Sequence, residues 1–106
     1  MVVSKVESSG ANNSVLKACK IMDVLFRNFF HGYSASELAE ATGLGRSDIT
    51  RYVQTLETAG WAERIPETGR IRPSHKVAQS AVQVMNELES AEARVVESKQ
   101  RLSRIR

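Results

Sequence analysis

The stretch SELAEATGLGRSDITRYVQTLETAGW, residues 36–61, contains two short amphipathic patterns separated by Gly-Leu-Gly. The first pattern stops at Gly43, where a helix commonly ends in a left-handed conformation that suits glycine. The second begins near Arg46 and repeats apolar side chains at helical spacing on one face. Its apolar positions are Ile49, Tyr52, Val53 and Leu56. We therefore predict two helices of about two and four turns, joined at a tight corner as in a helix-turn-helix.

An amphipathic helix is also predicted ahead of this corner, within residues 14–30. Its apolar positions recur at intervals of three and four, which indicates a buried stripe. They are Val15, Ala18, Ile21, Met22, Leu25 and Phe29. Ser14 is the expected N-cap of this helix, and Ser34 with Glu37 fits a capping box at the start of the next one.

The single cysteine of the chain, Cys19, excludes an intramolecular disulfide and a multi-cysteine zinc site. Because it lies among the apolar positions of the first helix, we interpret it as a buried thiol that packs like a small apolar side chain. Phe29, Phe30 and Tyr33 are expected to close one end of the same core. Residues 1–13 are rich in Ser, Gly and Asn without periodicity, which predicts a flexible arm.

Residues 61–73, WAERIPETGRIRP, change from helical to alternating periodicity. Trp61 and Ile65 alternate with polar neighbours, a Pro-Glu-Thr-Gly turn signal follows, and the alternation resumes around Ile71. This pattern predicts a two-stranded hairpin. A hairpin that directly follows a helix-turn-helix is a wing.

Neither Gly nor Pro occurs from Ser74 to the C-terminus, and the apolar residues there follow a heptad. Alternating steps of four and three residues connect Val77, Ala81, Val84, Leu88, Ala91, Val95, Ser98, Leu102 and Ile105, of which only Ser98 is polar. A seam of two positions in seven is narrower than the face of a helix packed on a globular core. We therefore predict a homodimer, in either parallel or antiparallel orientation. The residues expected to hold it are Val84, Leu88, Val95 and Leu102.

Residues 14–75 resemble the N-terminal winged helix-turn-helix domain of the isocitrate lyase regulator (IclR) family. The resemblance rests on SVLKACKIMDVLF, SASELAEATGLGRSDITRYVQTLETAGWAER and PETGRIR, which occur here in the family's order. It implies binding to specific sites on double-stranded DNA. Gly45 stands where family members usually carry Ser as the cap of the recognition helix. The family continues into a larger effector-binding domain and this chain does not, so we expect no small-molecule effector and a phage or mobile-element regulator.

The expected fold class is mainly α with a small β-hairpin: a winged helix-turn-helix followed by a long C-terminal coiled-coil-like helix. The expected organisation is a flexible arm at residues 1–13, a DNA-binding domain at residues 14–75, and a dimerisation helix at residues 76–106. The change from helical spacing to the two-residue alternation of strands marks the wing and separates it from the helices on either side.

The exposed face of the second corner helix is the predicted DNA-reading surface. It presents Arg46, Ser47, Thr50, Arg51 and Gln54. In the major groove, Arg pairs with guanine O6 and N7, Gln pairs with adenine N6 and N7, and hydroxyls suit phosphate or a thymine edge. Arg64, Arg70 and Arg72 would line the wing and contact phosphate or the minor groove. The alternative interpretation of both sets is ordinary solvated surface.

Other classes of function find little support. The net charge of +3 is too mild to indicate nucleic acid by itself. No signal-peptide core or membrane-length apolar stretch occurs, so a cytoplasmic, nucleoid-associated protein is expected. Motifs for phosphate binding, metal binding or nucleophilic catalysis are missing, so neither an enzyme nor a cofactor or metal site is expected. Two alternatives stay open: a DNA-binding accessory role in replication, transposition or packaging, and a protein-binding adaptor that uses the winged-helix surface.

Overall fold

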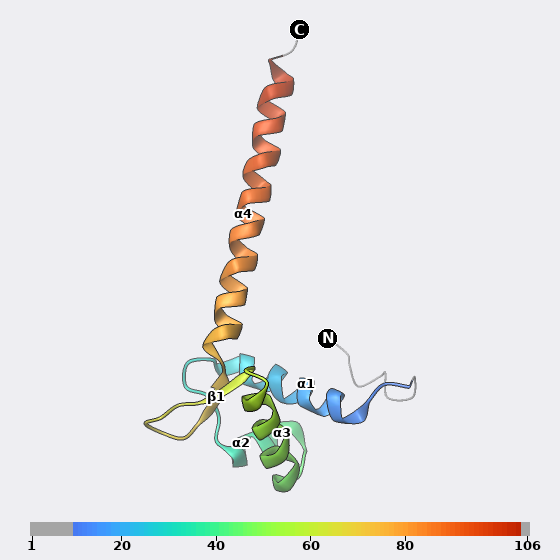
Figure 1. Ribbon diagram of the computed structural model, residues 1–106, viewed down its shortest axis with the longest axis vertical. Coiled ribbons are helices and arrows are strands. Elements are labelled where there is room, and N and C mark those ends of the chain that lie inside the picture. Colours follow the sequence, from blue (N-terminus) through green and yellow to red (C-terminus); the bar gives the residue numbers. More distant parts are fainter. Residues whose placement is uncertain (1–9, 105–106) are drawn as a thin grey trace. The chain divides into compact units, whose positions relative to one another are not determined.

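The computed structural model describes residues 10–104, which form two compact units divided between Ser74 and His75 (Figure 1). The first unit contains α1 (Asn13–Leu25), the short 3-10 helix η2 (Phe26–Asn28), α2 (Ala35–Thr42), α3 (Arg46–Thr58), β1 (Ala62–Arg64) and β2 (Ile71–Pro73). The second unit is α4 (His75–Ser103). The predicted fold class is confirmed. Most of the predicted N-terminal arm, residues 1–9, and Ile105 of the predicted heptad lie outside the described residues.

Helix α1 is capped by Asn12 and not by Ser14. The Asn12 Oδ1 accepts hydrogen bonds from the backbone N–H groups of Ser14 and Val15, at 2.9 and 3.2 Å. Asparagine is at least as good a cap as serine at this position. The helix therefore begins at Asn13, and the prediction of Ser14 as its cap is wrong.

The buried face of α1 turns away from the first part of the predicted stripe. Its buried side chains are Ile21, Met22, Val24 and Leu25. Val15 is 58 % exposed, Phe30 is 75 % exposed, and Cys19 is exposed. Burial of Val24 directs the side of the helix that carries Cys19 toward solvent, whereas Val15 lies in the first turn, ahead of the buried residues, which begin at Ile21. The interpretations of Cys19 as a buried thiol and of Phe30 as a core-closing ring are therefore wrong.

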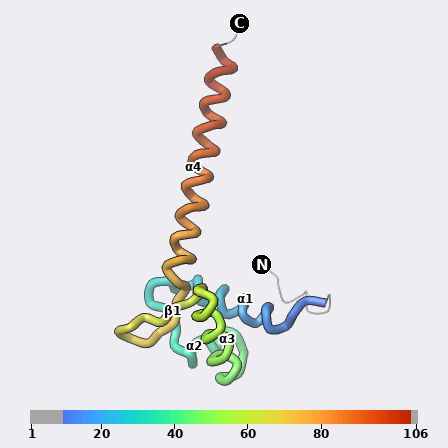
Figure 2. The backbone as a smooth tube through the Cα atoms, viewed as in Figure 1, coloured from blue at the N-terminus to red at the C-terminus, as the bar shows by residue number. Residues whose placement is uncertain are grey.

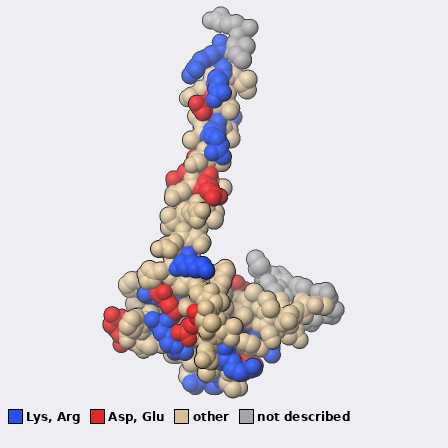
Figure 3. Space-filling view, in the orientation of Figure 1, with Lys and Arg blue, Asp and Glu red and all other residues tan. Residues whose placement is uncertain are grey.

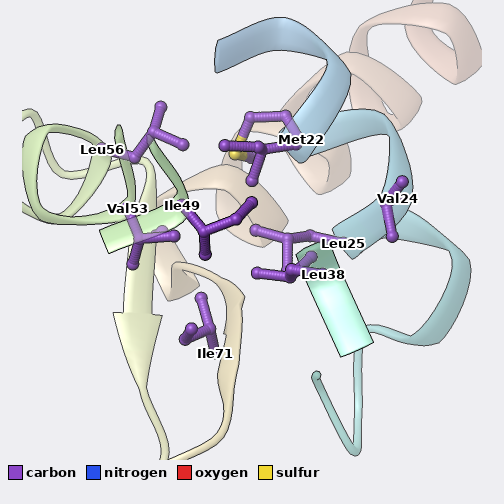
Figure 4. Packing of buried hydrophobic residues seen from close by; sticks show 10 residues of the cluster. Met22, Val24, Leu25, Leu38, Ile49, Val53, Leu56 and Ile71 are labelled. Carbon is purple, nitrogen blue, oxygen red and sulfur yellow. The ribbon is translucent and has the colours of Figure 1, made fainter. Parts of the chain in front are cut away.

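In the first unit the three helices lie beside the hairpin (Figure 2), and the buried hydrophobic residues of the core come from all of these elements. Leu25 of α1, Leu38 of α2 and Ile49 of α3 lie close together at its centre (Figure 4). Val53 lies on the side of α3 toward Ile71 of β2. Each of these five side chains is at most 1 % exposed. The apolar face of α3 is thus fixed inward, which directs its polar face outward.

The capping box predicted at the start of α2 is present. The Glu37 N–H donates to Ser34 Oγ at 3.1 Å, and the Ser34 N–H donates to Glu37 Oε1 at 3.0 Å. At the other end, Gly43 has φ +77° and its N–H donates to the Ala39 carbonyl at 2.9 Å. The predicted left-handed end of the helix is therefore confirmed.

Thr42 supplies a link in the corner that the sequence pattern did not predict. Its side chain is buried, and its Oγ1 donates to the Leu38 carbonyl at 2.6 Å. The same oxygen accepts from the Leu44 N–H at 3.2 Å. One hydroxyl thus joins the last turn of α2 to the turn that leads into α3.

The wing is a small antiparallel hairpin in which Glu63 of β1 lies opposite Arg72 of β2. On the edge of β2 that does not face β1, Tyr33 and Ile71 exchange two backbone hydrogen bonds, each of 2.8 Å. Ala62 is the buried side chain of β1, whereas Trp61 is 50 % exposed. The hairpin is confirmed. In β1 the inward position is shifted by one residue, to Ala62, whereas Ile71 of β2 is buried as the alternation predicted.

Helix α4 is continuous from His75 to Ser103, and none of its residues is buried. Its large apolar side chains are 50–68 % exposed. They are Val82, Val84, Met85, Leu88, Val95, Val96 and Leu102. Within the described range, no helix combines the length and the apolar character needed to cross a bilayer.

Candidate nucleic-acid interface

The predicted reading residues share the solvent-facing side of α3. Ile49 and Val53 on the opposite side are fully buried. The exposed residues are Arg46, Ser47, Thr50, Arg51 and Gln54. Because core packing fixes the helix from behind, these five side chains keep a common orientation toward solvent.

Arg51 is held in place by Asp48 and Tyr52, contacts that the sequence pattern did not predict. Its Nη2 lies 2.7 Å from Asp48 Oδ1, and its guanidinium carbon lies 5.3 Å from the centre of the Tyr52 ring. The hydrogen bond that Arg51 donates to Asp48, together with the negative charge of Asp48, raises the pKa of Arg51, which stays fully cationic. Lys17 of α1 also lies 3.9 Å from Asp48 Oδ2. Asp48 therefore orients the arginine, and the side chain of Arg51 remains 67 % exposed.

Arg46 connects the beginning of α3 to the beginning of α2. Its Nη1 donates to Ser36 Oγ at 2.9 Å, across the corner. Ser36 and Arg46 are both exposed, so this pair lies on the surface. No local sequence signal predicts it, because the two residues are ten positions apart and belong to different helices.

The hydroxyl of Thr50 already donates a hydrogen bond within α3. It donates to the Arg46 carbonyl at 3.0 Å, in the pattern that threonines often adopt inside helices. The proton is therefore directed at the backbone, while the methyl group and the oxygen lone pairs remain available. This arrangement suits apolar contact with a thymine methyl group.

The three wing arginines differ in how far their charges are already matched. The Arg70 guanidinium contacts Glu37 Oε1 at 2.6 Å and the carbonyls of His31 and Gly32 at 3.1 and 3.0 Å. Arg72 donates to Glu63 Oε2 at 2.9 Å, and its side chain is only 19 % exposed.

Arg64 is less tightly paired than Arg70 and Arg72. Its side chain is 47 % exposed, with Glu57 Oε2 at 3.4 Å and the Gly69 carbonyl at 3.5 Å. Its weaker pairing leaves Arg64 better able than Arg70 or Arg72 to turn toward a phosphate. The sequence alone could not distinguish the three, since Glu37 lies 33 residues from Arg70.

Basic side chains are visible along the edge of the first unit where α2 and α3 lie, interspersed with acidic ones (Figure 3). This mixture agrees with the mild net charge of the chain. Residues 10–104 contain no group of three or more His, Cys, Asp or Glu that could hold a metal ion. The candidate interface thus consists of individually oriented cations on α3 and the wing.

Comparison with known proteins agrees with this geometry. The crystal structure of HmgR from Pseudomonas aeruginosa matches 77 % of this chain with a TM-score of 0.63 and 25 % sequence identity, and this chain spans 35 % of HmgR. A search of curated proteins found no significant match. The IclR helix-turn-helix domain model matches residues 14–66, which is half of the chain. The chain therefore belongs to the IclR helix-turn-helix family, whose members are DNA-binding transcriptional regulators and not enzymes.

Proposed function

We propose that this protein binds specific sites on double-stranded DNA and regulates transcription, with α3 in the major groove and the wing on the flanking backbone. The observation that supports this most directly is the two-sided character of α3. Its apolar face is buried in the core, and its other face presents two arginines, a glutamine and two hydroxyl groups to solvent. The major groove admits a helix of this kind, and these side chains match its donor and acceptor pattern.

Arg51 and Gln54 are the proposed base readers. They lie three positions apart on the exposed face, so both can reach neighbouring base pairs. Asp48 restricts the rotation of Arg51 before DNA arrives, which reduces the ordering needed on binding. Arg46, Ser47 and Thr50 complete the surface.

Arg64 is the proposed phosphate contact of the wing. Arg70 and Arg72 add positive potential there. The hydrogen bonds of Arg70 hold the hairpin against the rest of the domain, whereas that of Arg72 joins the two strands of the hairpin. Phosphate contacts of this kind position a protein on DNA without reading its sequence. Loss of Arg64 should therefore weaken binding to all sequences by similar factors.

Two copies are proposed to act together, joined through the apolar seam of α4. The seam residues Val84, Leu88, Val95 and Leu102 are 54–68 % exposed in the single chain. Exposed apolar surface of this extent on a helix indicates an interaction site. A dimer presents two reading helices to two half-sites of a palindromic operator, which raises affinity. Such a regulator would be found with the nucleoid.

The experiment begins with duplexes selected from a random pool by the full chain, followed by fluorescence anisotropy over a series of salt concentrations. We expect the selected site to bind at least about 1,000-fold more tightly than a scrambled duplex. Arg51→Ala should weaken the selected site by about ten- to a hundredfold and relax one base position. Arg27→Ala is the matched control, because Arg27 is an exposed arginine of the same domain outside this face.

Failure to bind any duplex at low salt would contradict the proposal and favour the protein-binding adaptor. Equal affinity of the Arg51→Ala and Arg27→Ala variants would show that the reading face is elsewhere. Mapping of bound genomic sites in the host then separates transcription from replication, transposition or packaging, because regulatory sites lie at promoters.

A further inference from the structure

We propose that α4 pairs with α4 of a second copy in antiparallel orientation, with Leu88 packed against the partner's Ala91 and Glu87 paired with the partner's Arg94. The inference rests on the proposed dimer and adds its orientation and register. It follows from two properties of the exposed seam: the sizes of its side chains and the charges beside it.

The seam has a hollow at one small residue. Ala91 lies between the larger side chains of Leu88 and Val95 in the heptad. A surface depression on α4 is lined by Gln83, Val84, Asn86, Glu87, Leu88, Ser90, Ala91 and Arg94. A knob from another helix would fill such a hollow, as coiled-coil packing requires.

Side-chain size favours the antiparallel arrangement. A parallel pair in register would place each small seam residue against its own copy, which leaves three thin layers, at Ala81, Ala91 and Ser98. An antiparallel pair with its twofold axis between residues 89 and 90 instead places Leu88 against Ala91. The same register packs Val84 against Val95 and Val77 against Leu102. Ala81 then faces Ser98, which forms two thin layers where the parallel pair has three, and the small Ala91 is matched by the large Leu88, so the volume is filled more evenly.

The charges beside the seam lead to the same orientation. In a parallel coiled coil, Glu87 would face the partner's Glu92, and Arg94 would face the partner's Lys99. Both pairs carry like charges, and flanking charges of this kind decide orientation in coiled coils. In the antiparallel register, Glu87 faces Arg94 of the partner subunit, and the twofold axis creates this opposite-charge pair twice.

Glu87 and Arg94 are available for such pairing. Both are exposed, and neither side chain makes a hydrogen bond or ion pair within the range 10–104. A shift of one heptad in either direction would bring Arg94 against Arg94 or Glu87 against Glu87. The charges therefore favour one register as well as one orientation. With a rise of 1.5 Å per residue, the two α4 N-termini would lie about 44 Å apart.

Charge reversal tests the orientation in the full chain, with the dimer dissociation constant measured by sedimentation equilibrium. Glu87→Arg and Arg94→Glu should each weaken the dimer about tenfold, because two attractive pairs become repulsive. The double variant carrying both changes should recover the parent affinity. Glu89→Arg is the matched control: it reverses one charge on α4 away from the seam, and should change the affinity little.

A parallel dimer predicts the opposite sign. Each single reversal would then create an attractive pair with Glu92 or Lys99 of the partner subunit and strengthen the dimer, which would overturn the proposal. A dimer indifferent to all three changes would overturn it too, because its interface would lie elsewhere. A chain that stays monomeric at tens of micromolar would overturn both this inference and the proposed dimer, whereas DNA binding is measured separately.

A distance measurement gives an independent result. In a Cys19→Ser background, a spin label at Gln100→Cys on the outer face of α4 reports the separation of the two C-terminal halves. The antiparallel register places the labelled positions about 30 Å apart along the axis, whereas a parallel pair keeps them within about 20 Å. A short distance would overturn the proposal.

Discussion

The first unit and α4 differ in where their apolar side chains lie. Every buried hydrophobic side chain in the described range belongs to the first unit, whereas α4 contains none. Both carry amphipathic helices with apolar residues at regular spacing. The difference shows that the same type of pattern can be buried within a unit or left exposed. The first unit has the contacts of a closed domain, and α4 has an exposed apolar seam, which we propose is a dimer interface.

The largest expected effect compares one leucine from each region. Leu38 is fully buried, so Leu38→Ala should lower the free energy of unfolding of the first unit by about 2–5 kcal/mol. Leu88 is 60 % exposed, so Leu88→Ala should leave that unfolding transition nearly unchanged and weaken dimerisation instead. Chemical denaturation of both variants, with sedimentation at matched concentrations, checks the pair. A large loss of domain stability in Leu88→Ala would mean that α4 also stabilises the first unit.

The second prediction compares two glycines with similar backbone angles. Gly32 has φ +72°, and an added Cβ would lie 2.5 Å from the Ile71 carbonyl oxygen. Gly43 has φ +77°, but no atom lies within 4 Å of an added Cβ. We expect Gly32→Ala to destabilise the domain by roughly 2–4 kcal/mol, through strain and a clash with β2. Gly43→Ala should cost about 1 kcal/mol, through backbone strain alone.

Thermal unfolding of the two variants checks this order. Equal losses would show that the wing can move away from residue 32 at little cost. That result would make the hairpin less firmly attached to the domain than the paired backbone bonds between Tyr33 and Ile71 indicate.

The third prediction separates the structural and DNA-contacting arginines of the wing. Arg70→Ala removes bonds to Glu37 and to two backbone carbonyls, so it should destabilise the domain by about 1–2 kcal/mol. Arg64→Ala should change stability little and reduce the salt dependence of DNA binding by about one unit of slope. The measurements are thermal unfolding and binding at several salt concentrations. A reversed result would exchange the proposed roles of the two residues.

The parts of the fold that the sequence predicted depend on short-range rules. The capping box of Ser34 and Glu37 spans three residues, and the left-handed end at Gly43 depends on a single residue type. Both are local, so both could be predicted without knowledge of tertiary structure. The exposed face of α3 could also be predicted, because one period fixes both of its sides.

The parts that could not be predicted depend on contacts between distant residues. The partner of Arg70 is 33 positions away, so its three bonds to the domain have no local signal. Cys19 fits an apolar stripe by spacing, yet it is exposed because burial of Val24 sets the rotation of α1. The orientation of Arg51 by Asp48 is local, but neither residue type alone shows which charges will pair.

The smallest expected effect concerns Glu37, which belongs to the capping box and also pairs with Arg70. The hydrogen bond from the Ser34 backbone lowers the pKa of Glu37, and Arg70 lowers it further, while desolvation opposes both. A carboxyl whose pKa is lower in the folded state stabilises the fold above its unfolded pKa. That contribution disappears as the pH falls through the folded pKa, which lies below the ordinary value of 4.5.

Glu37→Gln should therefore lower the Tm slightly at pH 7, and the difference from the parent should shrink as the pH falls below about 4. Glu40→Gln is the matched control, because Glu40 is an exposed carboxylate on the same helix. A Tm difference that stays constant from pH 7 to acid would mean that Glu37 acts through its shape and hydrogen bonding, and that its charge contributes nothing to holding the wing.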